Sequence, residues 1–143
     1  MPKTYKDYVQ SIYEAMADPN VAKGVGEYIK IGADKIKTHP SFKDMFKKMG
    51  REYSQTTGPK YIKIWDTERG QKRSIAAFID KVSGDILKPA GVNAPAKGAR
   101  GNVLDRIYMD QLRRNFDVHG GHLYSRHSLS YIFKKCLRVY YIF

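Results

Sequence analysis

The sequence predicts an α+β protein, in which N-terminal helices pack on a small antiparallel β-meander that is followed by a helix and a short closing strand. Three observations predict this class. Apolar residues recur at helical spacing through the first third of the chain, runs rich in β-forming residues follow between turn residues, and helical spacing returns after residue 102. With 143 residues, 42% of them hydrophobic, the chain can bury one ordinary core.

Two helices are expected before residue 39. Apolar residues in 5–16 follow the i, i+3, i+4 spacing of an amphipathic helix, and Thr4 is placed to cap it. Asp18-Pro19 ends this helix and begins a second one, whose apolar stripe runs through residues 21–36. Glycines weaken the second helix by about 1 kcal/mol each relative to alanine, although they also permit close packing; they are Gly24, Gly26 and Gly32.

A third, short helix is expected over residues 41–49, with Gly50 as its terminator, so that residues 1–58 form a helical part. The period then changes to that of β-structure. Three antiparallel strands are expected at residues 61–66, 74–80 and 85–88, joined by a hairpin loop around Gly70 and a turn at Ser83-Gly84.

Residues 87–102 (LKPAGVNAPAKGARGN) combine glycine, proline, alanine and basic side chains without an acid. Their prolines lack amide donors, so the stretch is not expected to continue the sheet. One interpretation is an anion site, in which Lys88, Lys97 and Arg100 lie beside flexible glycines just before a helix N-terminus. The other is a connector whose basic side chains point into water. The spacing matches neither a Walker A loop nor a G-x-G-x-x-G loop.

The last predicted helix follows this stretch, with Asn102 as its cap and apolar residues from Leu104 to Phe116 on one face. Residues 119–124 (HGGHLY) are expected to form a turn and a closing strand. We therefore expect a single α+β domain over residues 1–125, with residues 59–125 holding the sheet, the basic stretch and the helix. Residues 126–143 form a basic, aromatic C-terminal segment. It has the pattern of an amphipathic helix that packs on its own domain, a partner subunit or a membrane surface.

The net charge of +12 is spread along the chain, with ten basic against seven acidic residues in 1–58, nine against four in 59–101, and seven against three in 102–143. A surface of this kind attracts nucleic acid first, and an anionic membrane or an acidic protein second. A solvated basic face without a partner is the alternative. The basic residues expected to contact nucleic-acid phosphates or another anion are Lys63, Arg73, Lys88, Lys97, Arg100, Arg113 and Arg114.

Tyr61 and Trp65 share one strand face with Lys63, whereas Ile62 and Ile64 point to the opposite face. If the aromatic face is exposed, its rings can stack on bases beside a cation, as in single-strand binders. If the N-terminal helices cover it, both rings belong to the core. The sequence leaves these two alternatives open.

No catalytic residue, metal ligand or cofactor is predicted. His119, His122 and His127 with Cys136 lack the paired, closely spaced ligands of structural zinc sites. Four acids near the predicted hairpins can either gather a divalent cation for nuclease chemistry or serve as turn residues; they are Asp66, Glu68, Asp80 and Asp85. The lone cysteine excludes an intramolecular disulfide and suits a reducing compartment. No secretory signal or membrane-spanning run is recognised.

Four segments carry a resemblance to a known group: Phe78-Ile79-Asp80, residues 84–88 (GDILK), residues 94–102 (APAKGARGN) and residues 120–124 (GGHLY). Together they resemble small proteins of tailed bacteriophages, marine phages especially, over about residues 60–125. The resemblance implies a phage origin and a place in the host bacterial cytoplasm or the virion, but no activity.

The function expected from these observations is that of a non-enzymatic phage accessory protein that binds nucleic acid mainly through phosphate contacts. The alternative is a virion component or an inhibitor that binds an acidic host protein, and a metal-dependent nuclease is the third class. The sequence does not predict the oligomeric state.

Overall fold

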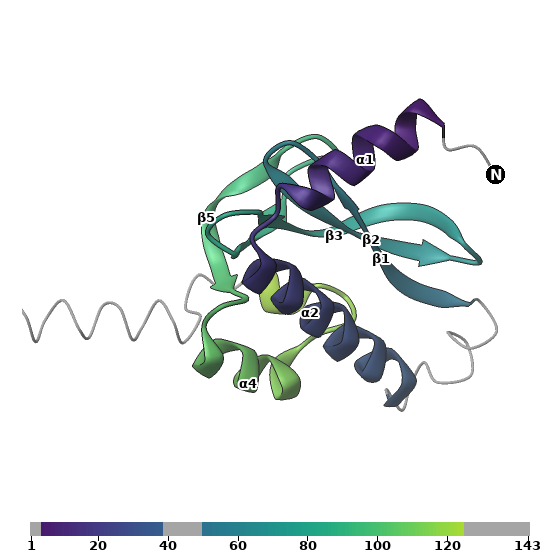
Figure 1. Ribbon diagram of the computed structural model, residues 1–143. Coiled ribbons are helices and arrows are strands. Elements are labelled where there is room, and N and C mark those ends of the chain that lie inside the picture. Colours follow the sequence, from purple (N-terminus) through teal and green to yellow (C-terminus); the bar gives the residue numbers. More distant parts are fainter. Residues whose placement is uncertain (1–3, 39–49, 125–143) are drawn as a thin grey trace, which may run out of the picture.

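The computed structural model describes residues 4–38 and 50–124, and it confirms an α+β fold (Figure 1). Within these described ranges, the elements follow one another in the order α1 (Tyr5–Ala15), α2 (Pro19–Thr38), β1 (Arg51–Thr57), β2 (Tyr61–Glu68), β3 (Gln71–Asp80), β4 (Asp85–Pro89), β5 (Pro95–Asn102), α4 (Arg106–Asn115) and a 3₁₀ turn (Gly121–Leu123). The helix expected over residues 41–49 and the C-terminal segment 126–143 lie outside the described residues.

The two N-terminal helices begin where the sequence predicts. Thr4 and Asp7 form a capping box at the start of α1: the Asp7 amide donates to the Thr4 hydroxyl at 3.3 Å, and the Thr4 amide donates to the Asp7 carboxylate at 3.0 Å. Asp18 accepts the Asn20 amide at 2.8 Å, just before α2 starts at Pro19. These caps satisfy amides that lack partners within the helix.

The five strands form one antiparallel sheet in the order β1-β2-β3-β4-β5, so each strand pairs with its neighbour in the sequence. The predicted hairpin around Gly70 is a two-residue turn, in which Arg69 (φ 53°) and Gly70 (φ 78°) are both left-handed. Two positive φ angles in succession match the right-handed twist of the flanking strands. This hairpin aligns β2 with β3 over their whole length.

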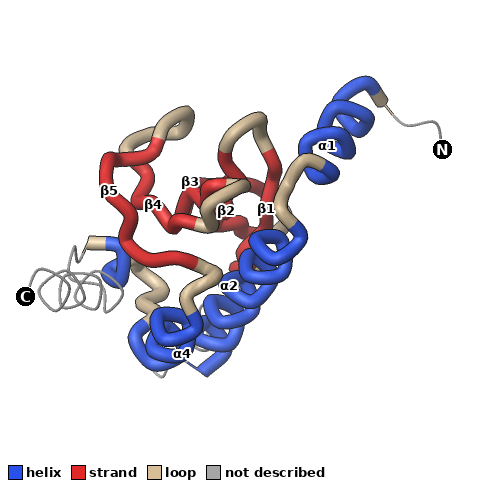
Figure 2. Tube along the Cα trace, turned by 60° about the vertical axis from the view of Figure 1, so that its left-hand side comes forward, coloured by secondary structure: helices blue, strands red, loops and turns tan. Residues whose placement is uncertain are grey.

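The core lies between the sheet and the pair α2 and α4, which cover the same face (Figures 1 and 2). On β2, Ile62 and Ile64 are 2% and 0% exposed and point into this core. α1 lies past the β1 edge of the sheet (Figure 2) and has no buried residue. In the part of the chain that the structure describes, no helix has both the length and the apolar character to span a membrane.

Glycine lets α2 approach its neighbours closely, as its sequence suggests. A Cβ atom at Gly24 would lie 2.7 Å from the Val103 Cβ and 3.1 Å from the Val103 carbonyl oxygen. A Cβ atom at Gly32 would lie 2.6 Å from the Tyr53 ring. Gly26, by contrast, faces open space. The helix therefore needs glycine at two of its three positions.

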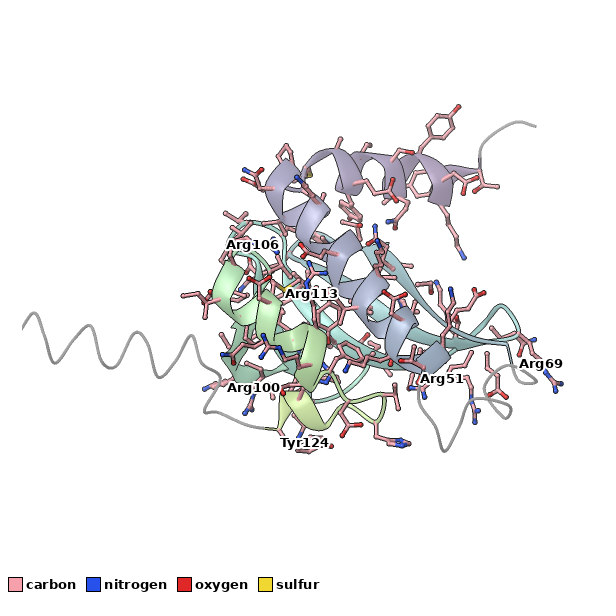
Figure 3. All side chains as sticks on the ribbon, turned by 90° about the horizontal axis from the view of Figure 1, so that it is seen from below. Arg51, Arg69, Arg100, Arg106, Arg113 and Tyr124 are labelled. Carbon is pink, nitrogen blue, oxygen red and sulfur yellow. The ribbon has the colours of Figure 1, made fainter. Side chains whose placement is uncertain are left out.

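A charged cluster joins α2 to α4 on the surface. Glu27 of α2 receives two hydrogen bonds from Arg106, at 2.8 and 3.0 Å, and one from Arg113 at 2.5 Å. Figure 3 shows both arginines in the space between the two helices. The Arg106 hydrogen bond lowers the pKa of Glu27, although burial of the carboxyl opposes this change. Arg113 is thus engaged by the fold.

Residues 51–57 differ from the expected helical part because they form strand β1. β1 is an edge strand with mostly polar side chains, and Tyr53 is its one large apolar residue. Such a strand lacks the apolar alternation by which strands are recognised in a sequence. Its pairing with β2 is visible only once the sheet is formed.

The proline- and glycine-rich stretch also differs from expectation, because it continues the sheet as the β4–β5 hairpin. Pro89 and Pro95 face each other at the loop end of this pair, beside residues 90–94, where no amide donor is needed. Gly98 has a φ of 92° at an irregularity in β5, and no non-glycine residue adopts such an angle cheaply. The expectation that prolines would exclude this stretch from the sheet was therefore wrong.

Two smaller expectations also fail. Asp105, not Asn102, caps α4 by accepting the Tyr108 amide at 3.1 Å. Asn102 instead donates to the Ser83 carbonyl oxygen and to Asp85, which fixes the turn between β3 and β4. In place of a closing strand, the chain forms a 3₁₀ turn after Gly120, whose φ is 81°.

The contacts of α2 predict opposite effects for two alanine substitutions in the same helix. Gly24→Ala should lower the free energy of unfolding by about 1–3 kcal/mol, because the new methyl group overlaps Val103. Gly26→Ala should raise it by about 0.5–1 kcal/mol, because it adds helix propensity without a contact. Urea denaturation of the full chain measures both, and equal effects would contradict the close packing of α2.

Candidate functional site

The outer face of the sheet, opposite α2 and α4, carries rings and lysines together. Tyr61 and Trp65 are both half-buried there. Beneath them, Phe78 is 0% exposed, and its ring meets the Tyr61 ring edge-on with centroids 5.7 Å apart. The Trp65 indole N–H donates to the Thr56 hydroxyl at 2.8 Å, which fixes the orientation of the indole. The rings thus belong neither fully to the core nor fully to solvent.

Three ammonium groups lie over these rings. The Lys63 Nζ is 5.9 Å from the centroids of both Trp65 and Phe78, the Lys72 Nζ is 5.2 Å from Trp65, and the Lys60 Nζ is 5.2 Å from Tyr61. No ion pair joins any of the three lysines to another residue within 4–38 or 50–124. We call these rings and cations the outer-face cluster; its members are Lys60, Tyr61, Lys63, Trp65, Lys72 and Phe78.

Sequence reasoning found half of this cluster. It identified Tyr61, Trp65 and Lys63 from their shared strand face, and the structure brings these three together. It missed Lys72, which belongs to β3 and opposes Thr67 across the hairpin. The position of Lys72 could have been predicted from the strand register, because a two-residue turn at Gly70 places Lys72 opposite the end of β2.

The remaining predicted basic residues do not join the outer-face cluster. Arg73 pairs with Glu68 at the β2–β3 hairpin. Lys88 lies at the other side of the sheet, where its Nζ is 4.0 Å from the centroid of the Tyr124 ring. Arg113 and Arg114 belong to α4, and Lys97 is exposed on β5. The seven predicted residues therefore do not form one positive surface.

Arg100 is a special case because it is buried. The residue is 7% exposed, and its Nε has no hydrogen-bond partner among the described residues. It belongs to β5, at an irregularity in the pairing with β4. The expected basic loop beside a helix N-terminus does not form here, since Arg100 is enclosed and the carboxylate of Asp105 caps α4.

Each acid considered for a nuclease site has a role in the fold. Asp66 pairs with Arg51, and Glu68 pairs with Arg73. Asp80 accepts two amides in the β3–β4 turn, and Asp85 accepts the Asn102 side chain. Within the described ranges, no three histidine, cysteine or acidic residues gather as a metal site would require. His127 and Cys136 lie outside those ranges.

Behind the sheet, residues 116–124 enclose a cavity of about 220 Å³ against the ends of β1 to β4. Two contacts hold this segment in place. The Tyr28 hydroxyl and the His122 Nε2 are 2.8 Å apart, and an Arg51 Nη2 donates to the Val118 carbonyl oxygen at 2.5 Å. Arg51 also binds both oxygens of Asp66, each at 3.0 Å. The segment is thereby tied to α2 and to β1 at once.

His122 is neutral in this arrangement. Burial lowers its pKa from 6.5 to about 4, against the opposing influence of Asp117. The main-chain N–H of Asp117 donates to Nδ1 at 3.1 Å, so the ring proton resides on Nε2. Nε2 therefore donates to the Tyr28 oxygen. Sequence reasoning treated His122 as an ordinary histidine and did not find this pair, whose members are 94 residues apart.

The structure thus defines a class: an α+β domain whose five-stranded meander is covered by helices on one face and carries rings and lysines on the other. The chain matches the model of a family of unknown function, DUF7717, over residues 5–125. It therefore belongs to this family. No curated protein and no solved structure matches the chain. The family match assigns no activity to the outer face or to the cavity.

The half-buried His122 predicts an acid-sensitive fold. Because its pKa is lower in the folded chain than the ordinary 6.5, the unfolded chain binds more protons between pH 6.5 and about 4. The free energy of unfolding should therefore fall as the pH falls through this range, with a contribution of about 3 kcal/mol from His122. Urea denaturation at several pH values measures this dependence.

The matched variants are His122→Phe and His119→Gln. His122→Phe should flatten the pH dependence between pH 6.5 and 4, because the titrating group is gone. His119 is exposed, and its replacement should retain the wild-type profile. An unchanged slope in His122→Phe would contradict a neutral histidine at this position.

Proposed function

We propose that this protein is a non-enzymatic nucleic-acid-binding protein that holds a single strand against the outer face of its sheet. The observation that carries this proposal is the pair of half-buried rings, Tyr61 and Trp65, beneath three lysines that form no ion pair within 4 Å among the described residues. Rings on an open sheet stack on unpaired bases, and lysines beside them neutralise the phosphates between those bases.

The geometry favours a single strand over a duplex. The bases of a duplex are stacked on one another and do not present their faces to a protein surface, whereas unpaired bases do. Trp65 is held by Thr56 before any strand binds, so little conformational entropy is lost on stacking. Since every base has an aromatic face, binding should depend weakly on sequence and strongly on salt.

The biological setting is part of the proposal. The resemblance of residues 60–125 to small proteins of tailed phages supports an accessory role during infection, in the host bacterial cytoplasm or in the virion. The net charge of +12 supports attraction to a polyanion in either place.

Charge removal from the outer face should change the salt dependence of binding. For single strands, log K falls against log salt with a slope of about −0.7 per neutralised phosphate. Lys63→Ala/Lys72→Ala should therefore reduce the magnitude of this slope by about 1.4. Fluorescence anisotropy of a labelled oligonucleotide across a salt series measures the slope, and quenching of Trp65, the only tryptophan, reports contact with its ring.

The control is Lys30→Ala/Lys37→Ala, which removes the same charge from exposed positions of α2, on the other side of the sheet. This variant should keep nearly the wild-type slope. If both double variants lower the slope equally, or if Trp65 is not quenched, the strand does not lie on the outer face. Circular dichroism confirms that each variant is folded.

One observation favours the second candidate function, binding of a partner protein. α1 presents an exposed apolar stripe in which Tyr5 is 83%, Tyr8 58%, Ile12 59% and Met16 62% exposed. Exposed apolar patches of this kind mark sites of protein association. A stoichiometric complex with a host or virion protein that is insensitive to salt would support this function, because apolar contacts are not screened.

A further inference from the structure

The cavity behind the sheet is walled by aromatic rings. The Phe116 ring meets Tyr28 and Tyr53 edge-on, with centroids 5.4 and 5.9 Å away, and lies 4.2 Å from the ring of His122. Tyr124 stands at the rim, 66% exposed. At about 220 Å³, the cavity is smaller than the roughly 300–1,000 Å³ of sites for drug-sized ligands. Its size therefore suits one ring system.

The hydroxyl protons of Tyr28 and Tyr53 favour a ligand that carries hydrogen-bond acceptors. Tyr28 accepts a hydrogen bond from His122, and its own proton has no acceptor among the described residues. The Tyr53 oxygen accepts from Arg51 at 3.4 Å, and this hydroxyl too has no acceptor in the described part of the chain. Burial raises the pKa of Tyr53 to about 12, so the proton is retained at neutral pH.

The cavity also offers an acceptor of its own. Asp117 uses one carboxylate oxygen, Oδ1, to accept the His119 amide at 2.8 Å. The other, Oδ2, has no hydrogen-bond donor within residues 4–38 and 50–124. A ligand that only accepts, or a hydrocarbon ring, would leave some of these groups without a partner in the ligand, which costs free energy. A heteroaromatic ring with both donors and acceptors satisfies them.

The ammonium group of Lys88 lies at the rim of the cavity and can contact an anionic group of a ligand. Arg51 and Asp66 neutralise each other through two hydrogen bonds of 3.0 Å. Lys88 touches the Tyr124 ring but forms no ion pair with any described residue. An anionic substituent on a bound ring would therefore meet the Lys88 ammonium.

We propose that this cavity binds a nucleoside monophosphate, with the base in the cavity and the phosphate on Lys88. The site is distinct from the outer-face cluster and does not depend on it. The same chemistry occurs in free nucleotides and at a 5′-phosphorylated strand end, and the experiment separates these two sources.

Isothermal titration calorimetry of the full chain with each of the four nucleoside 5′-monophosphates tests the site. Saturable binding is expected for at least one of them. Lys88→Ala should weaken it about tenfold, through loss of the charge on the phosphate. Ser74→Phe should abolish it, because Ser74 is an exposed residue of the cavity wall and a ring there blocks the entrance. Lys97→Ala, outside the cavity, should retain the wild-type Kd.

Three further binding experiments distinguish this site from the outer face and identify the source of the ligand. Lys63→Ala/Lys72→Ala should bind the nucleotide normally, so that a failure of this site and a failure of the outer face are distinguishable. Competition by an oligonucleotide with a 5′-phosphate, but not by one without it, would assign the site to strand ends; no competition by either would assign it to free nucleotides. Inorganic phosphate should compete weakly, since it lacks the base.

Three outcomes would overturn the proposal: no saturable binding at millimolar nucleotide, binding indifferent to both Lys88→Ala and Ser74→Phe, or competition by inorganic phosphate as strong as by the nucleotide. Thermal unfolding of each variant, followed by circular dichroism, shows that a lost affinity is not a lost fold.

Discussion

The alternation of side chains along β2 is the constraint on which the rest of this structure depends. Ile62 and Ile64 point to one side and are fully enclosed by the helices, so Tyr61, Lys63 and Trp65 must point to the other. A slip of one residue in register would bury a lysine and expose two isoleucines. The same alternation that builds the core therefore creates a face of rings and cations.

The helices act on the opposite side of the sheet, where they set the depth of the core and the position of residues 116–124. Close approach of α2 at Gly24 and Gly32 lets Tyr28 reach the end of the sheet. There it meets His122 and holds the segment whose other anchor is Arg51. The cavity is thus a consequence of how α2 packs. The two candidate sites lie on opposite faces of the sheet and use different residues, which allows one to fail without the other.

Much of this fold and half of the outer-face cluster follow from local sequence, whereas the cavity depends on partners distant in the chain. The stripe of α2, the Gly70 turn and the alternation of β2 could all be predicted, because each is set by neighbours within one element. Strand β1 was not predicted because an edge strand needs few apolar residues. The β4–β5 hairpin was not predicted because its prolines, which face each other, stand where no amide donor is required. The burial of Arg100 and the pairing of Tyr28 with His122 carry no sequence signal, since they arise from tertiary contacts.

The measurement that tests the central claim most directly is photochemical cross-linking of the full chain to a single strand containing 5-iodouracil, followed by mass spectrometry of the linked peptides. The account predicts links to Tyr61 and Trp65, because stacked rings lie in van der Waals contact with the bases. Links confined to α2 or α4, or none above the level of a heat-unfolded control, would contradict the assignment of the outer face as the surface that binds nucleic acid.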